Sequence, residues 1–209
     1  MNASVNKLRK LPIGIQSFEK LRSEGFMYVD KTALVFRLAQ AGIPCFLSRP
    51  RRFGKSLLLS TFEAYFKGKK ELFEGLAIEQ LEQNWFEYPV LHLSLNAERY
   101  DSRERLENML VSQLEGWEAE YGITEINSSN SIRFATVIRR AYEQTGRRVV
   151  VLVDEYDKPM LRSFDNPALQ DDFRETLTAF YTVLKDTDPY LQFVFITGVT
   201  KFAQMGIFS

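Results

Sequence analysis

The chain has 209 residues, 45% of them hydrophobic, which is enough for one α/β domain with a sizeable core. Basic and acidic residues number 27 each, so the net charge is zero and the chain lacks the overall positive charge of a nucleic-acid-binding protein. A single cysteine, Cys45, and a single histidine, His92, exclude an internal disulfide and any metal site built from several such residues. This cysteine usage, with no apolar run of 18 residues, predicts a cytoplasmic protein outside the membrane.

The N-terminal part is expected to be largely irregular. A short strand is predicted over Phe26–Val29, where β-prone residues follow Gly25. Asp30 is placed to cap a helix over residues 31–41, and Gly42 is placed to end that helix.

Residues 43–56 form the most informative stretch of the sequence. The apolar run Ile43–Leu47 predicts a buried strand, and residues 54–56 (Gly-Lys-Ser) begin an apolar helix that extends to about Phe66. This order is that of a phosphate-binding loop, in which a helix N-terminus faces the phosphates, a Lys reaches the outer ones and a Ser hydroxyl holds Mg²⁺. Arg49 stands where the pattern G-x-x-x-x-G-K-[ST] has its first glycine, so an ordinary helix N-terminus with a capping Ser is the alternative.

Candidate nucleotide contacts gather in this loop, where four cations and no acid lie within seven residues. Arg51 and Arg52 either supply charge that a loop poor in glycine lacks in free N–H groups, or they form surface ion pairs. The full candidate set for nucleotide binding is Arg49, Arg51, Arg52, Phe53, Gly54, Lys55, Ser56 and Leu57.

A strand and two amphipathic helices are predicted next. Pro89 opens a strand over Val90–Leu95, in which His92 is expected to have a structural role. The first helix starts at Asp101 or Ser102, and the second ends at Gly146. The apolar stripe of the first consists of Leu106, Met109, Leu110, Leu114 and Trp117, and that of the second consists of Phe134, Val137, Ile138 and Ala141.

A second motif covers residues 149–155. Five consecutive apolar residues, Val149–Val153, predict a strand buried on both faces, and two carboxylates follow at its carboxyl end. Ligands bind at that edge of parallel sheets. This is a Walker B pattern, in which Asp154 supports, through water, the Mg²⁺ that Ser56 holds, and Glu155 polarises the attacking water. A buried strand followed by an acidic turn is the alternative, but the two motifs occur in the order expected of one site.

The last predicted elements are a helix from about Pro167 to Lys185 and a buried strand, Leu191–Thr197, that ends in a polar residue. In ATPases with an extra strand between the two Walker strands, such a residue contacts the γ-phosphate or the attacking water, which is the role expected of Thr197. The alternation of strands and helices predicts an α/β fold, a three-layer αβα sandwich around a parallel sheet.

Five segments carry a resemblance to a known family. They are LPIGIQSF (11–18), YVDKT (28–32), FLSRPRRFGKSL (46–57), VDEYDKP (153–159) and TGVTKF (197–202). Together they resemble the bacterial AAA-ATPase-like family over nearly the whole chain. The resemblance implies a P-loop ATPase of the additional-strand class in which Arg49 is usual. It also implies a C-terminal domain resembling PD-(D/E)xK nucleases, and relative to that pattern the chain stops at Ser209, before the fifth strand, the helical lid and that domain.

We therefore interpret residues 39–209 as a P-loop ATPase core without its lid and residues 1–38 as a segment that packs near the nucleotide base, with base contacts expected from Tyr28–Thr32. The expected activity is Mg²⁺-dependent ATP binding and hydrolysis, with Glu155 and Thr197 as catalytic residues. Two alternatives stay open: a nucleotide-binding switch or scaffold with negligible turnover, and a module that controls a nuclease acting on DNA through the missing domain. Self-association is also expected, because a missing fifth strand leaves a sheet edge unpaired.

Overall fold

The computed structural model describes residues 10–96, 99–124 and 129–200. Its centre is a sheet of four strands in the order β1-β4-β3-β2, and every neighbouring pair is parallel. The strands are β1 (Cys45–Ser48), β2 (Val90–Ser94), β3 (Val149–Asp154) and β4 (Leu191–Gly198). β4 therefore lies between β1 and β3, as predicted for a fold with an extra strand between the two strands that carry the motifs.

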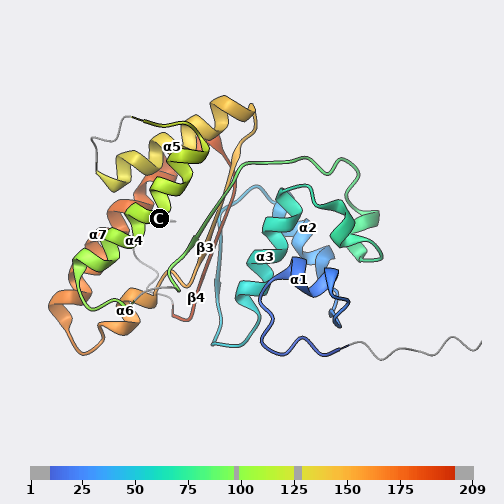
Figure 1. The fold of residues 1–209 in the computed structure, drawn as a ribbon, viewed down its shortest axis with the longest axis horizontal. Coiled ribbons are helices and arrows are strands. Elements are labelled where there is room, and N and C mark those ends of the chain that lie inside the picture. The colour runs from blue at the N-terminus through green and yellow to red at the C-terminus, as the bar shows by residue number, and fades with distance from the viewer. Residues whose placement is uncertain (1–9, 97–98, 125–128, 201–209) are drawn as a thin grey trace, which may run out of the picture.

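Helices cover both faces of the sheet and give the fold three layers (Figure 1). One layer contains α1 (Phe18–Ser23), α2 (Thr32–Gln40) and α3 (Lys55–Phe66), and the other contains α4 (Arg103–Glu120), α5 (Asn130–Thr145), α6 (Lys158–Arg162) and α7 (Pro167–Asp186). Three short 3-10 helices are η1 (Lys70–Phe73), η2 (Ala77–Gln80) and η3 (Asp188–Tyr190). The predicted fold class, an αβα sandwich around a parallel sheet, is confirmed. Within the described residues, no helix combines the length and apolar character needed to cross a bilayer.

Strand β3 is the centre of the core, because all six of its residues are buried. Its odd-numbered valines, 149, 151 and 153, belong to the core on the side of α4, α5 and α7. Val150 and Leu152 belong to the core on the side of α2 and α3. Full burial of one such side chain stabilises the fold by roughly 1.5–3 kcal/mol. The apolar run therefore places the acidic end of β3 between two packed layers.

Aromatic packing fixes α3 against β4. The ring of Phe62 lies 5.0 Å from that of Phe193 and 4.8 Å from that of Phe195, measured between centroids. Phe66, one turn further along α3, lies 5.2 Å from Phe193. Aromatic pairs at such distances contribute about 0.5–1.5 kcal/mol each beyond the burial of their area. Because these contacts hold the body of α3, its first turn has a fixed place beside the carboxyl ends of β1 and β4.

The opposite layer confirms the two predicted apolar stripes, since every residue of both stripes is buried. A buried ion pair joins the two helices: the Arg133 guanidinium donates from Nε and Nη2 to the two carboxylate oxygens of Glu118, at 2.8 and 2.7 Å. Gly146 ends α5 in the left-handed conformation, with φ of 65°. A residue without a Cβ adopts this conformation at little cost, which explains the glycine at this position.

The predicted strand over Phe26–Val29 is wrong. The segment has no regular secondary structure and pairs with no strand among the described residues. The Phe26 N–H donates to the Leu21 oxygen, and the Met27 N–H donates to the Lys10 oxygen. One of its β-prone residues packs on a helix instead, because the Tyr28 ring lies edge-on against Phe18 of α1, whereas Val29 is 70% exposed. Helix α1 itself was not predicted.

The single histidine has the structural place expected of it. Nδ1 of His92, on β2, lies 2.8 Å from Oε2 of Glu63 on α3. This hydrogen bond lowers the pKa of Glu63, and a second one from Lys67 acts in the same direction. Burial raises the pKa, but the two bonds outweigh it and the pKa falls to about 2. The pair joins α3 to the outer strand of the sheet.

The end of β4 leaves no room for a side chain at Gly198. A Cβ atom there would lie 2.5 and 2.7 Å from ring atoms of Tyr156, which is itself buried, and 3.0 Å from Cγ of Asp157. We expect Gly198→Ala to lower the free energy of unfolding by about 1–3 kcal/mol, because overpacking forces the buried ring to move. Urea denaturation measures this loss.

Gly116 provides the matched control for this prediction. It lies inside α4, and a Cβ atom added there would meet no heavy atom within 4 Å beyond the backbone of its own helix and its chain neighbours. Gly116→Ala should therefore stabilise the protein by up to about 1 kcal/mol, through helix propensity alone. Equal effects of the two substitutions would contradict the steric argument at Gly198.

Candidate functional site

The loop between β1 and α3 has the strained backbone of a tight phosphate-type turn. Arg52 and Gly54 both have positive φ, at 68° and 75°. For a residue with a Cβ this conformation costs roughly 1–2 kcal/mol, so the strain at Arg52 must be offset by the surrounding structure. The Arg49 N–H donates to the oxygen of Gly198 on β4, which ties the start of the loop to the sheet.

Lys55 begins α3 and turns back across this loop. Its Nζ donates to the carbonyl oxygens of Arg49 and Pro50, at 3.0 and 3.2 Å, and the residue is only 5% exposed. Among the described residues, no carboxylate forms an ion pair with it. A buried cation at the positive end of a helix dipole is electrostatically unfavourable unless an anion binds beside it. The arrangement therefore suits an anion such as a phosphate group.

The Asp154 carboxylate, at the carboxyl end of β3, accepts hydrogen bonds from α3, from β4 and from the segment after β2. The hydroxyl of Ser56 donates to Oδ2 at 2.6 Å, and the hydroxyl of Thr197 donates to Oδ1 at 2.7 Å. The side-chain amide of Asn96 lies beyond the end of β2 and donates to Oδ2 at 3.4 Å. Asp154 is buried, so these donors compensate for the lost hydration of its charge.

Glu155 follows Asp154 with its backbone in the left-handed region, at φ of 53°. Its N–H donates to the Thr197 hydroxyl at 3.3 Å. That hydroxyl therefore accepts from Glu155 and donates to Asp154, and it orders both carboxylate residues. Glu155 also lines the cleft described next. The structure thus brings together Lys55, Ser56, Asp154, Glu155 and Thr197, all five of which were singled out in the sequence.

A cleft of about 690 Å³ lies beside the loop. One wall consists of residues 12–16 from the N-terminal segment, and the other consists of the start of α3 together with Arg52 and Glu155. The lining residues are Pro12, Ile13, Gly14, Ile15, Gln16, Arg52, Gly54, Lys55, Ser56, Leu57 and Glu155. The sequence predicted that residues 1–38 pack near the nucleotide base but expected the contacts from Tyr28–Thr32. It did not single out residues 12–16, since nothing local in this irregular stretch indicates which distant loop it contacts.

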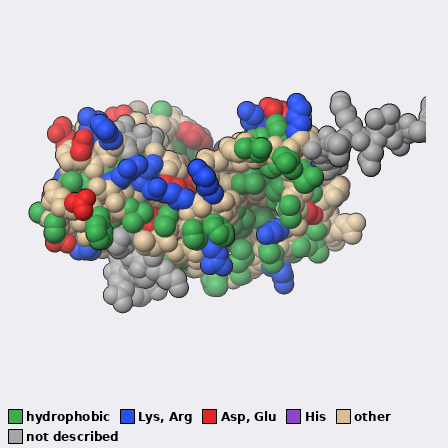
Figure 2. Space-filling model, turned by 90° about the horizontal axis from the view of Figure 1, so that it is seen from below, with side chains coloured by type: hydrophobic (Ala, Val, Ile, Leu, Met, Phe, Trp, Pro, Cys, Tyr) green, Lys and Arg blue, Asp and Glu red, His purple; other side chains and the backbone are tan. Residues whose placement is uncertain are grey.

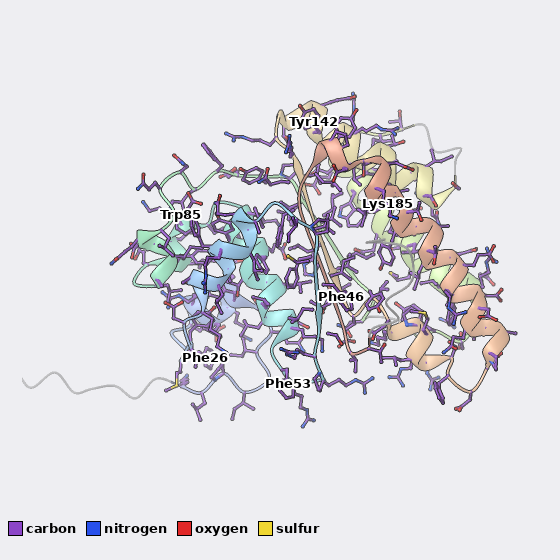
Figure 3. All side chains as sticks on the ribbon, turned by 180° about the vertical axis from the view of Figure 1, so that it is seen from behind. Phe26, Phe46, Phe53, Trp85, Tyr142 and Lys185 are labelled. Atoms are coloured by element: carbon purple, nitrogen blue, oxygen red, sulfur yellow. The ribbon has the colours of Figure 1, made fainter. Side chains whose placement is uncertain are left out.

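The remaining loop residues lie at the surface. Arg49, Arg51 and Arg52 are exposed, and Arg51 and Arg52 form no ion pair with any described residue, which leaves the surface ion-pair alternative without support. Phe53 is 68% exposed and lies at the turn between β1 and α3 (Figure 3). Figure 2 views the molecule from the side of the strands' carboxyl ends, and Lys and Arg side chains gather across the middle of that face.

Residues Tyr28–Thr32 have structural contacts away from the cleft lining. The Asp30 carboxylate accepts from the N–H and hydroxyl of Thr32 and from the N–H of Ala77. Although burial opposes the charge, these bonds keep the pKa of Asp30 below its usual value. Asp30 thus joins the start of α2 to η2, and base contacts from this segment stay a prediction.

Two polar residues near Asp154 were not identified from the sequence. Nζ of Lys158, the first residue of α6, donates to the backbone oxygen and to Oδ1 of Asn96, at 2.5 and 2.9 Å. The same Nζ lies 4.0 Å from Oε2 of Glu155. Burial lowers the pKa of Lys158, and the nearby charge of Glu155 acts in the opposite direction. The only sequence signal is that Lys158 lies three residues after Glu155.

Asp157 secures the turn that follows β4. One of its carboxylate oxygens, Oδ2, accepts from the N–H groups of Val199 and Thr200 and from the Thr200 hydroxyl, at 2.7–2.8 Å. The residue is fully buried. The segment after β3 and the segment after β4 are therefore joined by one carboxylate.

The donor set around Asp154 fits a magnesium–nucleotide complex better than a metal site made by protein alone. Within the described residues, no group of three or more His, Cys, Asp or Glu side chains is placed to hold a metal ion. Mg²⁺ bound with a nucleotide, however, takes only one or two protein oxygens and completes its shell with phosphate oxygens and water. The adjacent Ser56 hydroxyl and Asp154 carboxylate meet that smaller requirement.

A family model described as "Predicted AAA-ATPase" matches residues 12–208. The chain belongs to this AAA-ATPase-like family. A curated relative, "Uncharacterized protein in vnfD 5'region" from Azotobacter chroococcum mcd 1, is 41% identical over 202 residues, which are 96% of this chain and 39% of the relative. The chain thus spans well under half the length of that relative. No solved structure matches the chain. The family description is consistent with nucleotide binding at the loop before α3.

The Thr197 hydroxyl should contribute to the stability of the free protein. Thr197→Val removes one donor to the buried Asp154 carboxylate and the acceptor of the Glu155 N–H. We expect the free energy of unfolding to fall by about 1–3 kcal/mol, because hydrogen bonds to buried charged groups are costly to lose. Thermal and urea denaturation measure the change.

Thr187 offers a control of equal burial. Its hydroxyl donates to the Val183 oxygen, which also accepts the Thr187 N–H and so keeps a partner after Thr187→Val. This control should cost less than about 1 kcal/mol. A loss at Thr197 no larger than that at Thr187 would contradict the role assigned to the Asp154 network.

Proposed function

We propose that this AAA-ATPase-like chain binds ATP as its magnesium complex and hydrolyses it slowly. The observation that carries the proposal is Lys55, a buried cation at the N-terminus of α3 whose partners among the described residues are carbonyl oxygens alone. A phosphate group would supply the missing negative charge and accept from the backbone N–H groups at the start of the helix. The family description supports the choice of an adenine nucleotide.

Ser56 and Asp154 would hold the magnesium ion, which supplies charge neutralisation for the phosphates when bound. Residues 49–57 would enclose the phosphates. The exposed Arg51 and Arg52 would add positive charge, and Arg52 already lines the cleft. Residues 12–16 form the opposite wall, so in this proposal the N-terminal segment of residues 1–38 lies beside the nucleotide base.

Glu155 would act as the general base that orients the attacking water. Glu155 lines the cleft together with Lys55 and Ser56, and its carboxylate accepts no hydrogen bond from a described residue, so its oxygens would be available to a water molecule. Thr197 would set the position of Glu155 through the N–H that its hydroxyl accepts, and it would respond to the γ-phosphate from that place.

A nucleotide-controlled switch with negligible turnover is the second candidate. It is favoured by Asp157, which links the segment after Asp154 to residues 199–200 and so connects the site to the chain beyond β4. A nuclease-like domain, DNA as its substrate, self-association and a cytoplasmic location stay predictions from the sequence. Nucleotide affinity is common to both candidates, and the rate of hydrolysis separates them.

Lys55→Ala should weaken ATP binding by about 10- to 150-fold, because a hydrogen bond to a charged group contributes roughly 1.5–3 kcal/mol. Isothermal titration calorimetry with MgATP measures the affinity. Lys67→Ala is the matched control, because Lys67 follows the other end of α3 and pairs with Glu63 at the surface. Unchanged affinity in Lys55→Ala, or equal loss in both variants, would contradict phosphate binding at this loop.

Glu155→Gln should leave ATP affinity within about twofold of the wild type and slow single-turnover hydrolysis by about 10²-fold or more, because it removes the general base but keeps the side-chain shape. Rapid quenching with labelled ATP measures the rate. Hydrolysis at the wild-type rate would exclude Glu155 as the base. Tight binding with no hydrolysis in the wild type would instead favour the switch.

A further inference from the structure

Lys158 is held in place by a residue from the far edge of the sheet. Its ammonium donates to two oxygens of Asn96, the backbone carbonyl and the side-chain amide, at 2.5 and 2.9 Å. Asn96 in turn donates to Asp154 at 3.4 Å. A lysine ammonium has three donors, so one remains after both bonds to Asn96 are made. The position of the Nζ atom is therefore determined by Asn96 and not by a solvent-exposed ion pair.

The nearest carboxylate to that remaining donor belongs to Glu155. Oε2 of Glu155 lies 4.0 Å from Nζ, and the two side chains are only 14% and 19% exposed. Exposed pairs contribute little because water screens them and ordering two long side chains costs entropy. Here Asn96 already fixes Lys158, so less entropy is lost in forming the pair, and both side chains are largely buried, so water screens the pair less.

Little else orients the Glu155 carboxylate in the part of the chain that the structure describes. Its backbone is fixed by the left-handed φ and by the bond to Thr197, but its carboxylate accepts no hydrogen bond there and has Lys158 as its ion-pair partner. The charged groups that act on Lys158 are the acidic Glu155 and Asp154 and the basic Arg51 and Arg162. Lys158 does not line the cleft, whereas Glu155 does.

We propose that Lys158, seated on Asn96, is a positioning residue that holds the Glu155 carboxylate toward the cleft for nucleotide hydrolysis. The inference rests on the proposed function, because Glu155 needs a fixed orientation only if it directs a water molecule at a bound phosphate. Lys158 acts through Glu155 and makes no contact with the nucleotide. A misplacement of a reacting group by about 1 Å can cost on the order of 10²-fold in rate, so the contribution of one such contact is measurable.

The first test separates turnover from binding. Lys158→Met should lower the single-turnover rate by about tenfold or more and leave MgATP affinity, measured by calorimetry, within about twofold. Lys158→Arg keeps the charge and should recover most of the rate. Arg162→Met is the matched control, since it removes a cation from the same helix, and it should hydrolyse ATP at the wild-type rate. Loss of affinity in Lys158→Met, or no loss of rate, overturns the inference.

The second test asks whether Lys158 acts through Glu155. In a Glu155→Gln background, Lys158→Met should cause no further loss of rate, because the carboxylate that it positions is already absent. An equal fractional loss in both backgrounds overturns the inference, since Lys158 would then act independently. If thermal unfolding shows that Lys158→Met does not fold, Lys158→Gln, which keeps a donor for Asn96 but lacks the charge, takes its place with the same outcomes.

The wild-type chain distinguishes this inference from the proposed function. If the wild type binds MgATP and hydrolyses it while Lys158→Met does so equally well, only the role of Lys158 fails. If the wild type binds MgATP but shows no hydrolysis, nucleotide binding stands and the positioning role is overturned. If the wild type binds no nucleotide, the proposed function fails and this inference fails with it.

Discussion

A buried carboxylate must be surrounded by donors, and that requirement at Asp154 organises the whole carboxyl edge of the sheet. The donors come from the first turn of α3, the end of β4 and the second residue beyond β2. Each of these segments is held elsewhere by its own apolar packing, as Phe62 holds α3 against β4. The core therefore positions the donors, and the donors fix the carboxylate. A change in any of the three segments alters the geometry at the other two.

Backbone strain marks the same region. Three residues other than glycine have positive φ, among those that the structure describes, and two of them, Arg52 and Glu155, line the same cleft. Such conformations cost about 1–3 kcal/mol each and persist only where the surroundings impose them. Strain at two points of one cleft is what a preorganised binding site requires, because residues held in place before a ligand arrives lose less entropy when it binds.

The sequence predicted those parts of the fold that depend on local pattern. The apolar run before Asp154 and the stripes of α4 and α5 identify buried faces because burial repeats with the period of each element. Ser56 and Asp154 were predicted to share one site because their two motifs occur in the order expected of such a site.

Contacts between distant irregular segments have no such pattern in the sequence. Residues 12–16 meet the loop before α3, and Lys158 meets Asn96 across 62 positions, only because the folded sheet brings them together. The prediction of a strand over Phe26–Val29 failed for a related reason, since a β-prone side chain such as Tyr28 can also pack on a helix from a segment that pairs with no strand.

The Asp157 carboxylate links the segment after β3 to the segment after β4. Because one oxygen of Asp157 accepts three hydrogen bonds from residues 199–200, the start of α6 is tied directly to the residues that follow β4. Thr197 lies two residues before Val199, the first residue that Asp157 binds, and its hydroxyl forms hydrogen bonds with both Asp154 and Glu155. A shift of the β4 backbone at Thr197 would therefore also displace residues 199–200, which are hydrogen-bonded to Asp157, the N-cap residue of α6. Hydrogen bonds of Thr197 and Asp157 thus connect Glu155, which lines the cleft, to α6 in the layer on the other face of the sheet from α3.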